Sequence, residues 1–132
     1  MPQLQNLVLK DREATPVSHT FVPRDIRDNV GTVVESSGVP IGESRVSVSL
    51  RKSNSNRYKA TVKLVVPVVR DQTVNGLVTP AVVRTSYVNI EFDFDGASTT
   101  QERENVQGMV ESAMAKAQVL IHDAVVGLQG VY

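Results

Sequence analysis

Cysteine is absent from this 132-residue chain, and its absence excludes several kinds of structure. The fold has no disulfide framework, no thiolate zinc site and no cysteine nucleophile. The sequence also lacks an apolar run long enough to span a membrane. Its first residues, Met1 to Asn6, contain no basic segment followed by an apolar core. We therefore expect an unsecreted, soluble protein that is not attached to a membrane.

Residues that carry catalytic chemistry are also scarce. The only histidines are His19 and His122, and adjacent residues on a helix, such as His122 and Asp123, face different directions. Asp93 and Asp95 share one face of a strand, which is typical of solvated charges. No nucleophile motif, phosphate-binding glycine loop or paired metal-carboxylate motif is found. We expect no enzymatic activity, no metal, no cofactor and no small-molecule substrate.

The net charge is zero, but the charges are unevenly distributed along the chain. Residues 45–70 contain no acidic side chain and hold seven of the 14 lysines and arginines. In residues 91–104 the balance reverses, with Arg103 as the one basic side chain. Such asymmetry creates a local positive field that the total conceals. Hydrophobic content of 41% and a length of 132 residues fit one globular domain, residues 1–132.

Polar and apolar residues alternate in three segments, 45–51, 59–65 and 85–91, with Val65 and Ser86 as the exceptions. Because residues i and i+2 share a face of a strand, each segment predicts one polar and one apolar face. In one antiparallel sheet the polar faces would combine into a surface that we call the polar plate. Its expected members are Arg45, Ser47, Ser49, Arg51, Lys59, Thr61, Lys63, Tyr87 and Asn89.

The polar plate has two possible explanations. Exposed strand faces commonly carry Lys, Thr and Ser for solubility and for protection of edges. The mixture here also suits single-stranded or looped RNA, because basic groups neutralise phosphate, hydroxyl and amide groups bond base edges, and an aromatic ring stacks on a base. For Tyr87 the competing possibility is a buried ring that packs beneath a loop.

The remaining patterns predict an α+β domain. Strands are expected at residues 4–9, 17–22 and 30–35, with a turn at 36–40. Asn75-Gly76 predicts a hairpin tip whose returning limb, delayed by Pro80, joins the sheet only near Val82. Helices are expected from a capping box at Thr99 and Glu102, and over residues 119–128. The apolar stripe of the first is Val106, Met109, Val110, Ala113 and Ala117.

Two helices cover such a sheet only marginally. A second copy that contributes its own helices, and joins its edge strand to this one, would bury both sheets and remove an exposed edge. We therefore expect a symmetric dimer.

Several segments, in order and at their spacing, resemble the coat proteins of the small icosahedral single-stranded RNA bacteriophages, the leviviruses. They include Thr20-Phe-Val-Pro-Arg-Asp-Ile-Arg-Asp-Asn-Val-Gly31 and Val39-Pro-Ile-Gly-Glu-Ser-Arg45. The others are residues 5–16, 56–59, 72–76, 84–89 and 130–132. Within that family the chain looks closest to phages specific for conjugative P-group plasmids.

The resemblance implies an N-terminal β-hairpin, a five-stranded antiparallel sheet and two C-terminal helices, in an interlocked dimer with a ten-stranded sheet. It further implies that dimers form a T=3 shell in the bacterial host cytoplasm and become part of the virion. Family dimers bind a genomic RNA hairpin, repress replicase translation and promote packaging. The alternative is a dimeric, sequence-specific RNA-binding regulator that forms no shell. The proline often found between the two helices is missing from residues 117–119.

The resemblance also assigns roles to individual residues. Ser47, Ser49, Thr61 and Lys63 match the pocket for an unpaired adenine. Tyr87 matches the residue that stacks on a loop base, with Asn89 as its polar neighbour. The residues that match backbone-contacting positions are Arg45, Arg51 and Lys59, to which we add Asn56 and Arg57 from the preceding turn.

Overall fold

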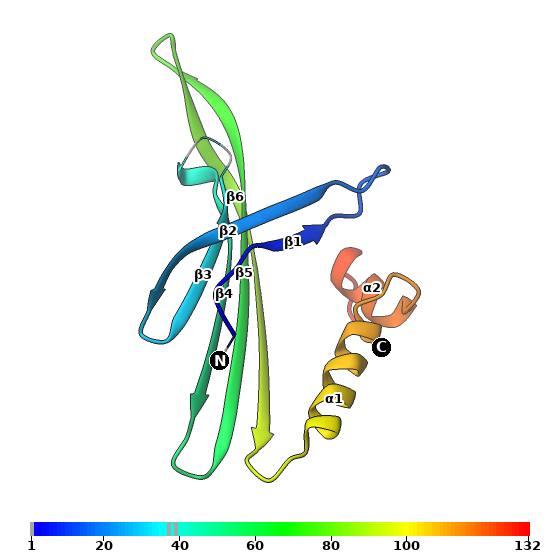
Figure 1. Ribbon diagram of the computed structural model, residues 1–132. Coiled ribbons are helices and arrows are strands. Elements are labelled where there is room, and N and C mark those ends of the chain that lie inside the picture. Colours follow the sequence, from blue (N-terminus) through cyan, green and yellow to red (C-terminus); the bar gives the residue numbers. More distant parts are fainter. Residues whose placement is uncertain (1, 37, 39) are drawn as a thin grey trace. The chain divides into compact units, whose positions relative to one another are not determined.

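A computed structural model describes residues 2–36, 38 and 40–132 of the chain. The strands are β1 (Leu7–Lys10), β2 (Ser18–Arg27), β3 (Val30–Glu35), β4 (Ser44–Lys52), β5 (Arg57–Val74) and β6 (Leu77–Asp95) (Figure 1). The helices are the short 3-10 helix η1 (Pro40–Gly42) and the α-helices α1 (Thr100–Ala113) and α2 (Val119–Val126). The predicted α+β class is confirmed.

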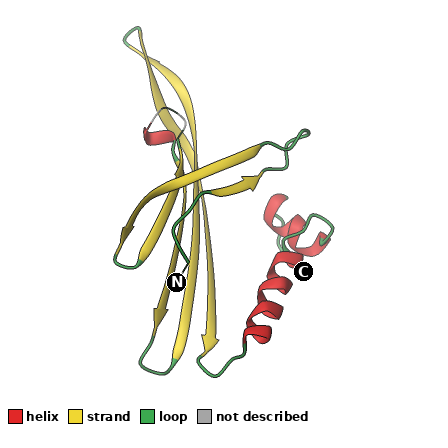
Figure 2. Cartoon of the chain, in the orientation of Figure 1, coloured by secondary structure: helices red, strands yellow, loops and turns green. Residues whose placement is uncertain are grey.

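Internal contacts divide the chain into two compact units, Met1–Asp93 and Phe94–Tyr132, and each is described by itself. The first unit is built of strands apart from η1, and the second contains both α-helices (Figure 2). The expectation of one domain over residues 1–132 stays a prediction.

The six strands follow one another in the sheet in chain order, β1 to β6. The paired strands from β1 to β5 run antiparallel. The expected hairpin of β1 and β2 is present, but it is continuous with the sheet, which therefore has six strands rather than five. The first strand begins at Leu7 instead of Leu4. The turn predicted at residues 36–40 includes Ser37 and Val39, which lie outside the described residues.

Alternation in the strands builds a small core on one face of the sheet. Phe21, Val33 and Val46 are buried there, and Leu4 and Leu7 pack against them. Leu4 reaches this position across Gly31, where an added Cβ would lie 3.1 Å from the Leu4 Cδ1 atom. A side chain at residue 31 would crowd Leu4, so the glycine there leaves room for Leu4 to pack against the core.

The tip of the long β5–β6 hairpin has the predicted Asn-Gly turn. Asn75 and Gly76 have φ angles of 52° and 79°, as a two-residue type I′ turn requires. The predicted delay of the returning limb is wrong, because β6 begins at Leu77 and continues through Pro80. Since β6 is the last strand of the sheet, a proline there can direct its missing N–H outward without breaking a ladder.

Both C-terminal helices are present. Thr99 and Glu102 form the predicted capping box at the start of α1. The chain leaves the helix after Ala113, so Ala117 lies in the turn before α2 rather than on the apolar stripe. This break forms without proline, through backbone bonds from Ala115 to Ser112 and from Gln118 to Ala115. Neither α-helix has a buried residue.

Candidate nucleic-acid interface

Strands β4 and β5 bring the two basic segments side by side. The cross-strand pairs on the polar plate are Ser47 with Lys63, Ser49 with Thr61, and Arg51 with Lys59. Cross-strand partners project from the same face of a sheet, so these six side chains form one surface. The apolar partners, such as Val46 with Leu64 and Val48 with Val62, lie on the opposite face.

These six side chains, with Val30, line a hollow of about 290 Å³. This volume lies at the small end of the range for ligand-binding pockets. Its walls supply hydroxyl groups and three cations around an apolar patch. Such a lining can hold the flat apolar body of a base while donating hydrogen bonds to its edge and neutralising phosphate.

Val30 is a residue that the sequence interpretation missed. It lies opposite Ser49 on β3, which brings a valine into a surface otherwise made of polar side chains. An apolar residue in a β-branched run carries no sign of a binding role. Its placement follows only from the β3–β4 register.

Strand β6 adds an aromatic ring to this region. Tyr87 is 76% exposed, so the alternative of a ring buried beneath a loop is wrong for this chain. Asn89 is exposed as well, and alternation places both on the face that carries Glu91 and Asp93. Neither Tyr87 nor Asn89 lines the hollow itself.

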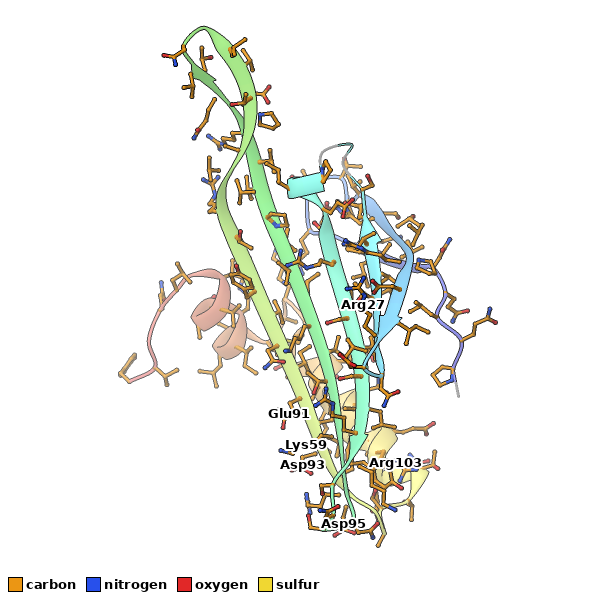
Figure 3. All side chains as sticks on the ribbon, turned by 90° about the vertical axis from the view of Figure 1, so that its left-hand side faces the viewer. Arg27, Lys59, Glu91, Asp93, Asp95 and Arg103 are labelled. Carbon is orange, nitrogen blue, oxygen red and sulfur yellow. The ribbon has the colours of Figure 1, made fainter. Side chains whose placement is uncertain are left out.

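Two cations expected to contact RNA already have acidic partners across the β5–β6 ladder. The Arg57 Nε atom lies 2.8 Å from the Asp93 Oδ1 atom. The Lys59 Nζ atom lies 3.7 Å from the Glu91 Oε1 atom, and Figure 3 labels both residues of this second pair. All four side chains are about half exposed, so these pairs add little stability and can exchange partners. The sequence analysis noted the acidic balance of residues 91–104 but did not pair these acids with the basic residues.

The remaining predicted residues on β4, β5 and their turn do not line the hollow. Arg45 is exposed beside Val65, two pairs from Ser47 and Lys63 and therefore on the same face. Asn56 occupies the β4–β5 turn with a φ of 58°, and the backbone N–H of Ser53 donates to the Arg57 carbonyl at 2.8 Å across that turn.

In residues 2–36, 38 and 40–132, no group of three or more His, Asp or Glu side chains is arranged to hold a metal ion. Over the same part of the chain, none of the helices combines the length and apolar character needed to cross a membrane.

Comparisons with known proteins agree with the resemblance noted in the sequence. The family model described as levivirus coat protein matches residues 2–132. The capsid protein of Pseudomonas phage PRR1 is 69% identical over 130 residues, covering 98% of this chain and 99% of the relative. The capsid protein of Escherichia virus Qbeta is 33% identical, covering 97% and 87%. The structure of the bacteriophage GA protein capsid matches with a TM-score of 0.83 and 26% identity, covering 98% of each chain.

These relatives are structural proteins of virus particles rather than enzymes, so the predicted non-enzymatic virion protein is confirmed. The chain belongs to the levivirus coat protein family.

Proposed function

We propose that this coat protein assembles as dimers into a T=3 shell and binds a hairpin of the viral genomic RNA on the inner face of its sheet. Binding represses translation of the replicase and marks the genome for packaging in the bacterial host cytoplasm. The observation that carries the RNA proposal is the hollow of about 290 Å³ lined by Ser47, Ser49, Arg51, Lys59, Thr61, Lys63 and Val30.

The chemistry of the hollow favours an unpaired base over a duplex. Ser47, Ser49 and Thr61 offer hydroxyl groups that can donate to or accept from base edges. Lys63 and Arg51 supply positive charge for the adjoining phosphates. Tyr87, 76% exposed, offers a ring on which a second base can stack. A flat sheet cannot enter a narrow RNA groove, but it can contact splayed bases.

The apolar surfaces that a single chain leaves exposed support the proposed dimer. Its buried core consists of Phe21, Val33, Val34 and Val46, which is small for 132 residues. On the apolar face of β4, Val48 and Leu50 are 51% and 58% exposed. The helical unit exposes Met109, Leu120, Val125 and Val126 by 63–70%. Helices of a second copy laid on the apolar face would cover both surfaces.

The exposed edge of the sheet also supports a dimer. Strand β6 has 19 residues and ends the sheet, whereas β1 at the other end has four. A long unpaired edge is prone to join another strand. Joining β6 of two copies removes that edge and gives one continuous sheet with six strands from each copy, twelve rather than the ten expected from the sequence.

Electron microscopy of the recombinant protein tests shell assembly. We expect negative-stain images to contain closed particles of uniform diameter, and three-dimensional reconstruction to give T=3 symmetry. Only dimers under all assembly conditions would contradict the shell and favour the RNA-binding regulator.

Filter binding with an RNA hairpin tests the site. Lys63→Ala and Tyr87→Ala should each weaken binding by about 1–3 kcal/mol, which is roughly 5- to 150-fold in dissociation constant. Lys116→Ala removes the same charge as Lys63→Ala from an exposed position beyond α1 and serves as the control. Equal affinities for all four proteins would show that the site lies elsewhere.

A further inference from the structure

His19 on β2 lies between two carboxylates that belong to different parts of the first unit. Its Nε2 atom is 2.7 Å from the Asp11 Oδ2 atom, and its Nδ1 atom is 2.9 Å from the Glu35 Oε2 atom. Asp11 follows β1, and Glu35 is the last residue of β3. The three side chains are 30–36% exposed, so water has access to them, and both carboxylates contact the ring directly.

The protonation of the ring follows from its partners. An ionised carboxylate only accepts hydrogen bonds, and a neutral imidazole has one N–H donor. Satisfying both carboxylates at these distances requires an imidazolium, which has two donors. Because Asp11 and Glu35 contact opposite nitrogens of the ring, they do not converge on a common metal position.

Asp11 also organises the loop that joins β1 to β2. Its Oδ1 atom accepts the backbone N–H groups of Val17 at 2.9 Å and Glu13 at 3.2 Å. Its own backbone N–H donates to the Val17 carbonyl at 3.2 Å. The loop of residues 11–17 is therefore held by Asp11, and Asp11 is held to β3 through His19.

The electrostatic surroundings of the ring are simple. The charged groups that face it are Asp11 from the loop and Glu35 from β3. On β1, the cross-strand partner of His19 is the apolar Leu9. On β4, Ser44 lies opposite Glu35, while the preceding Glu43 pairs with Arg24 of β2 at 3.5 Å.

We propose that the Asp11–His19–Glu35 bridge is a pH-sensitive latch that fastens the 11–17 loop to β3 when His19 is protonated and releases it when the ring loses a proton. Loss of one proton leaves a nitrogen lone pair facing a carboxylate oxygen at less than about 3 Å, a repulsive contact. One of the two connections then opens, and the loop loses its tie to β3.

The direction of the pH dependence follows from the bridge. The hydrogen bond to Asp11 is the largest cause that raises the pKa of His19 above its ordinary value of 6.5, and the hydrogen bond to Glu35 is the second. A raised pKa in the folded state means that the latch contributes its full stability below pH 6.5. That contribution is lost as the pH rises through the raised pKa.

Two measurements on the full chain test the latch. In ¹⁵N-edited NMR of unassembled protein, with His122→Asn used to assign the signals, the His19 ring should titrate with a midpoint above 6.5. By hydrogen exchange, corrected for the chemical effect of pH, the Val17 amide should exchange about threefold faster or more at pH 8.5 than at pH 5.5. A midpoint at or below 6.5, or corrected exchange that does not change with pH, overturns the proposal.

A matched pair of variants separates the latch from a general charge effect. In Glu35→Gln the amide can accept from or donate to Nδ1, so both protonation states of His19 are accommodated and the pH dependence of Val17 exchange should vanish. Glu13→Gln removes the same charge from the loop itself, where Glu13 contributes its backbone N–H to the cluster, and should keep the dependence. Identical behaviour of the two variants overturns the proposal.

Discussion

At the scale of single residues, the pair Lys59 and Glu91 links the polar plate to an acid of the same chain. A lysine that already faces a carboxylate must exchange it for an RNA phosphate. The exchange weakens every RNA equally, whatever its sequence, because it concerns phosphate contacts alone. A hairpin that also fills the hollow can offset this cost, whereas an unrelated RNA cannot. We infer that Glu91 lowers the affinity for all RNA, so that only an RNA that also fills the hollow binds tightly.

Glu91→Gln should therefore strengthen binding of unrelated single-stranded RNA and of the specific hairpin by similar factors. The plot of log K against log salt should become steeper by about 0.7, the value for one additional phosphate contact with a single strand. Filter binding over a series of salt concentrations gives both quantities. Glu111→Gln in α1 is the matched control, and equal salt slopes for both variants would contradict a role for Glu91.

The lowered pKa of Asp11 predicts a second pH-dependent change in stability, at acidic pH. Hydrogen bonds from the Val17 backbone, from His19 and from the Glu13 backbone lower the pKa of Asp11 from 3.8 to about 2. A lowered pKa in the folded state means that its contribution is complete above pH 3.8 and is lost as the pH falls through about 2. In thermal unfolding of unassembled protein, the wild type should lose its advantage over Asp11→Asn between these pH values. A constant difference down to pH 2 would contradict this account.

Single residues also mark the limit of what the sequence reveals. Alternation was enough to place Ser47, Ser49, Thr61 and Lys63 on one surface, because strand geometry fixes the face of each residue. It could not pair Lys59 with Glu91 or bring Val30 beside Ser49, because these contacts depend on register between strands. The bridge at His19 was missed for the same reason, since its partners come from two other segments.

At the scale of elements, the β5–β6 tip depends on its glycine. Gly76 has a φ of 79°, a conformation that other residues adopt at a cost, and an added Cβ would meet nothing within 4 Å. Gly76→Ala should therefore destabilise through backbone strain alone, by about 1–2 kcal/mol. Thermal unfolding at fixed protein concentration measures the change.

Gly108 in α1 provides a control of opposite sign. It too has open space around an added Cβ, but it lies inside a helix. Gly108→Ala should stabilise α1 by about 1 kcal/mol, since alanine loses less conformational freedom there. A loss of stability in both variants would mean that the space at these positions, rather than the φ angle, decides the outcome.

Local signals predicted some elements well. The capping box at Thr99 and Glu102 located the start of α1, because both partners lie within one turn of sequence. The passage of β6 through Pro80 was not predicted, since tolerance of proline depends on the strand being at the sheet edge. Edge position is a property of the assembled sheet.

At the scale of the whole molecule, the apolar face of β4 should decide self-association. Leu50 is 58% exposed in the chain, and burying such a side chain against a second copy contributes about 1.5–3 kcal/mol. Leu50→Lys should raise the dimer dissociation constant at least tenfold, as measured by light scattering over a dilution series.

Leu77→Lys is the control for that experiment. Leu77 is 69% exposed but lies at the hairpin tip, so its replacement should leave the dimer intact. Dimers of equal stability in both variants would show that copies do not meet through the β4 face.

The ion pairs between β5 and β6 have a further consequence in the proposed dimer. Joined at β6, the proposed dimer brings both copies of Glu91 and Asp93 toward a central seam, with the basic groups of β4 and β5 on either flank. A polyanion that crosses this seam is repelled in the middle and attracted at both sides. The part of an RNA that crosses should therefore present bases rather than phosphates. The acids would thus determine the path of the RNA across the dimer, and the two hollows would determine which bases bind.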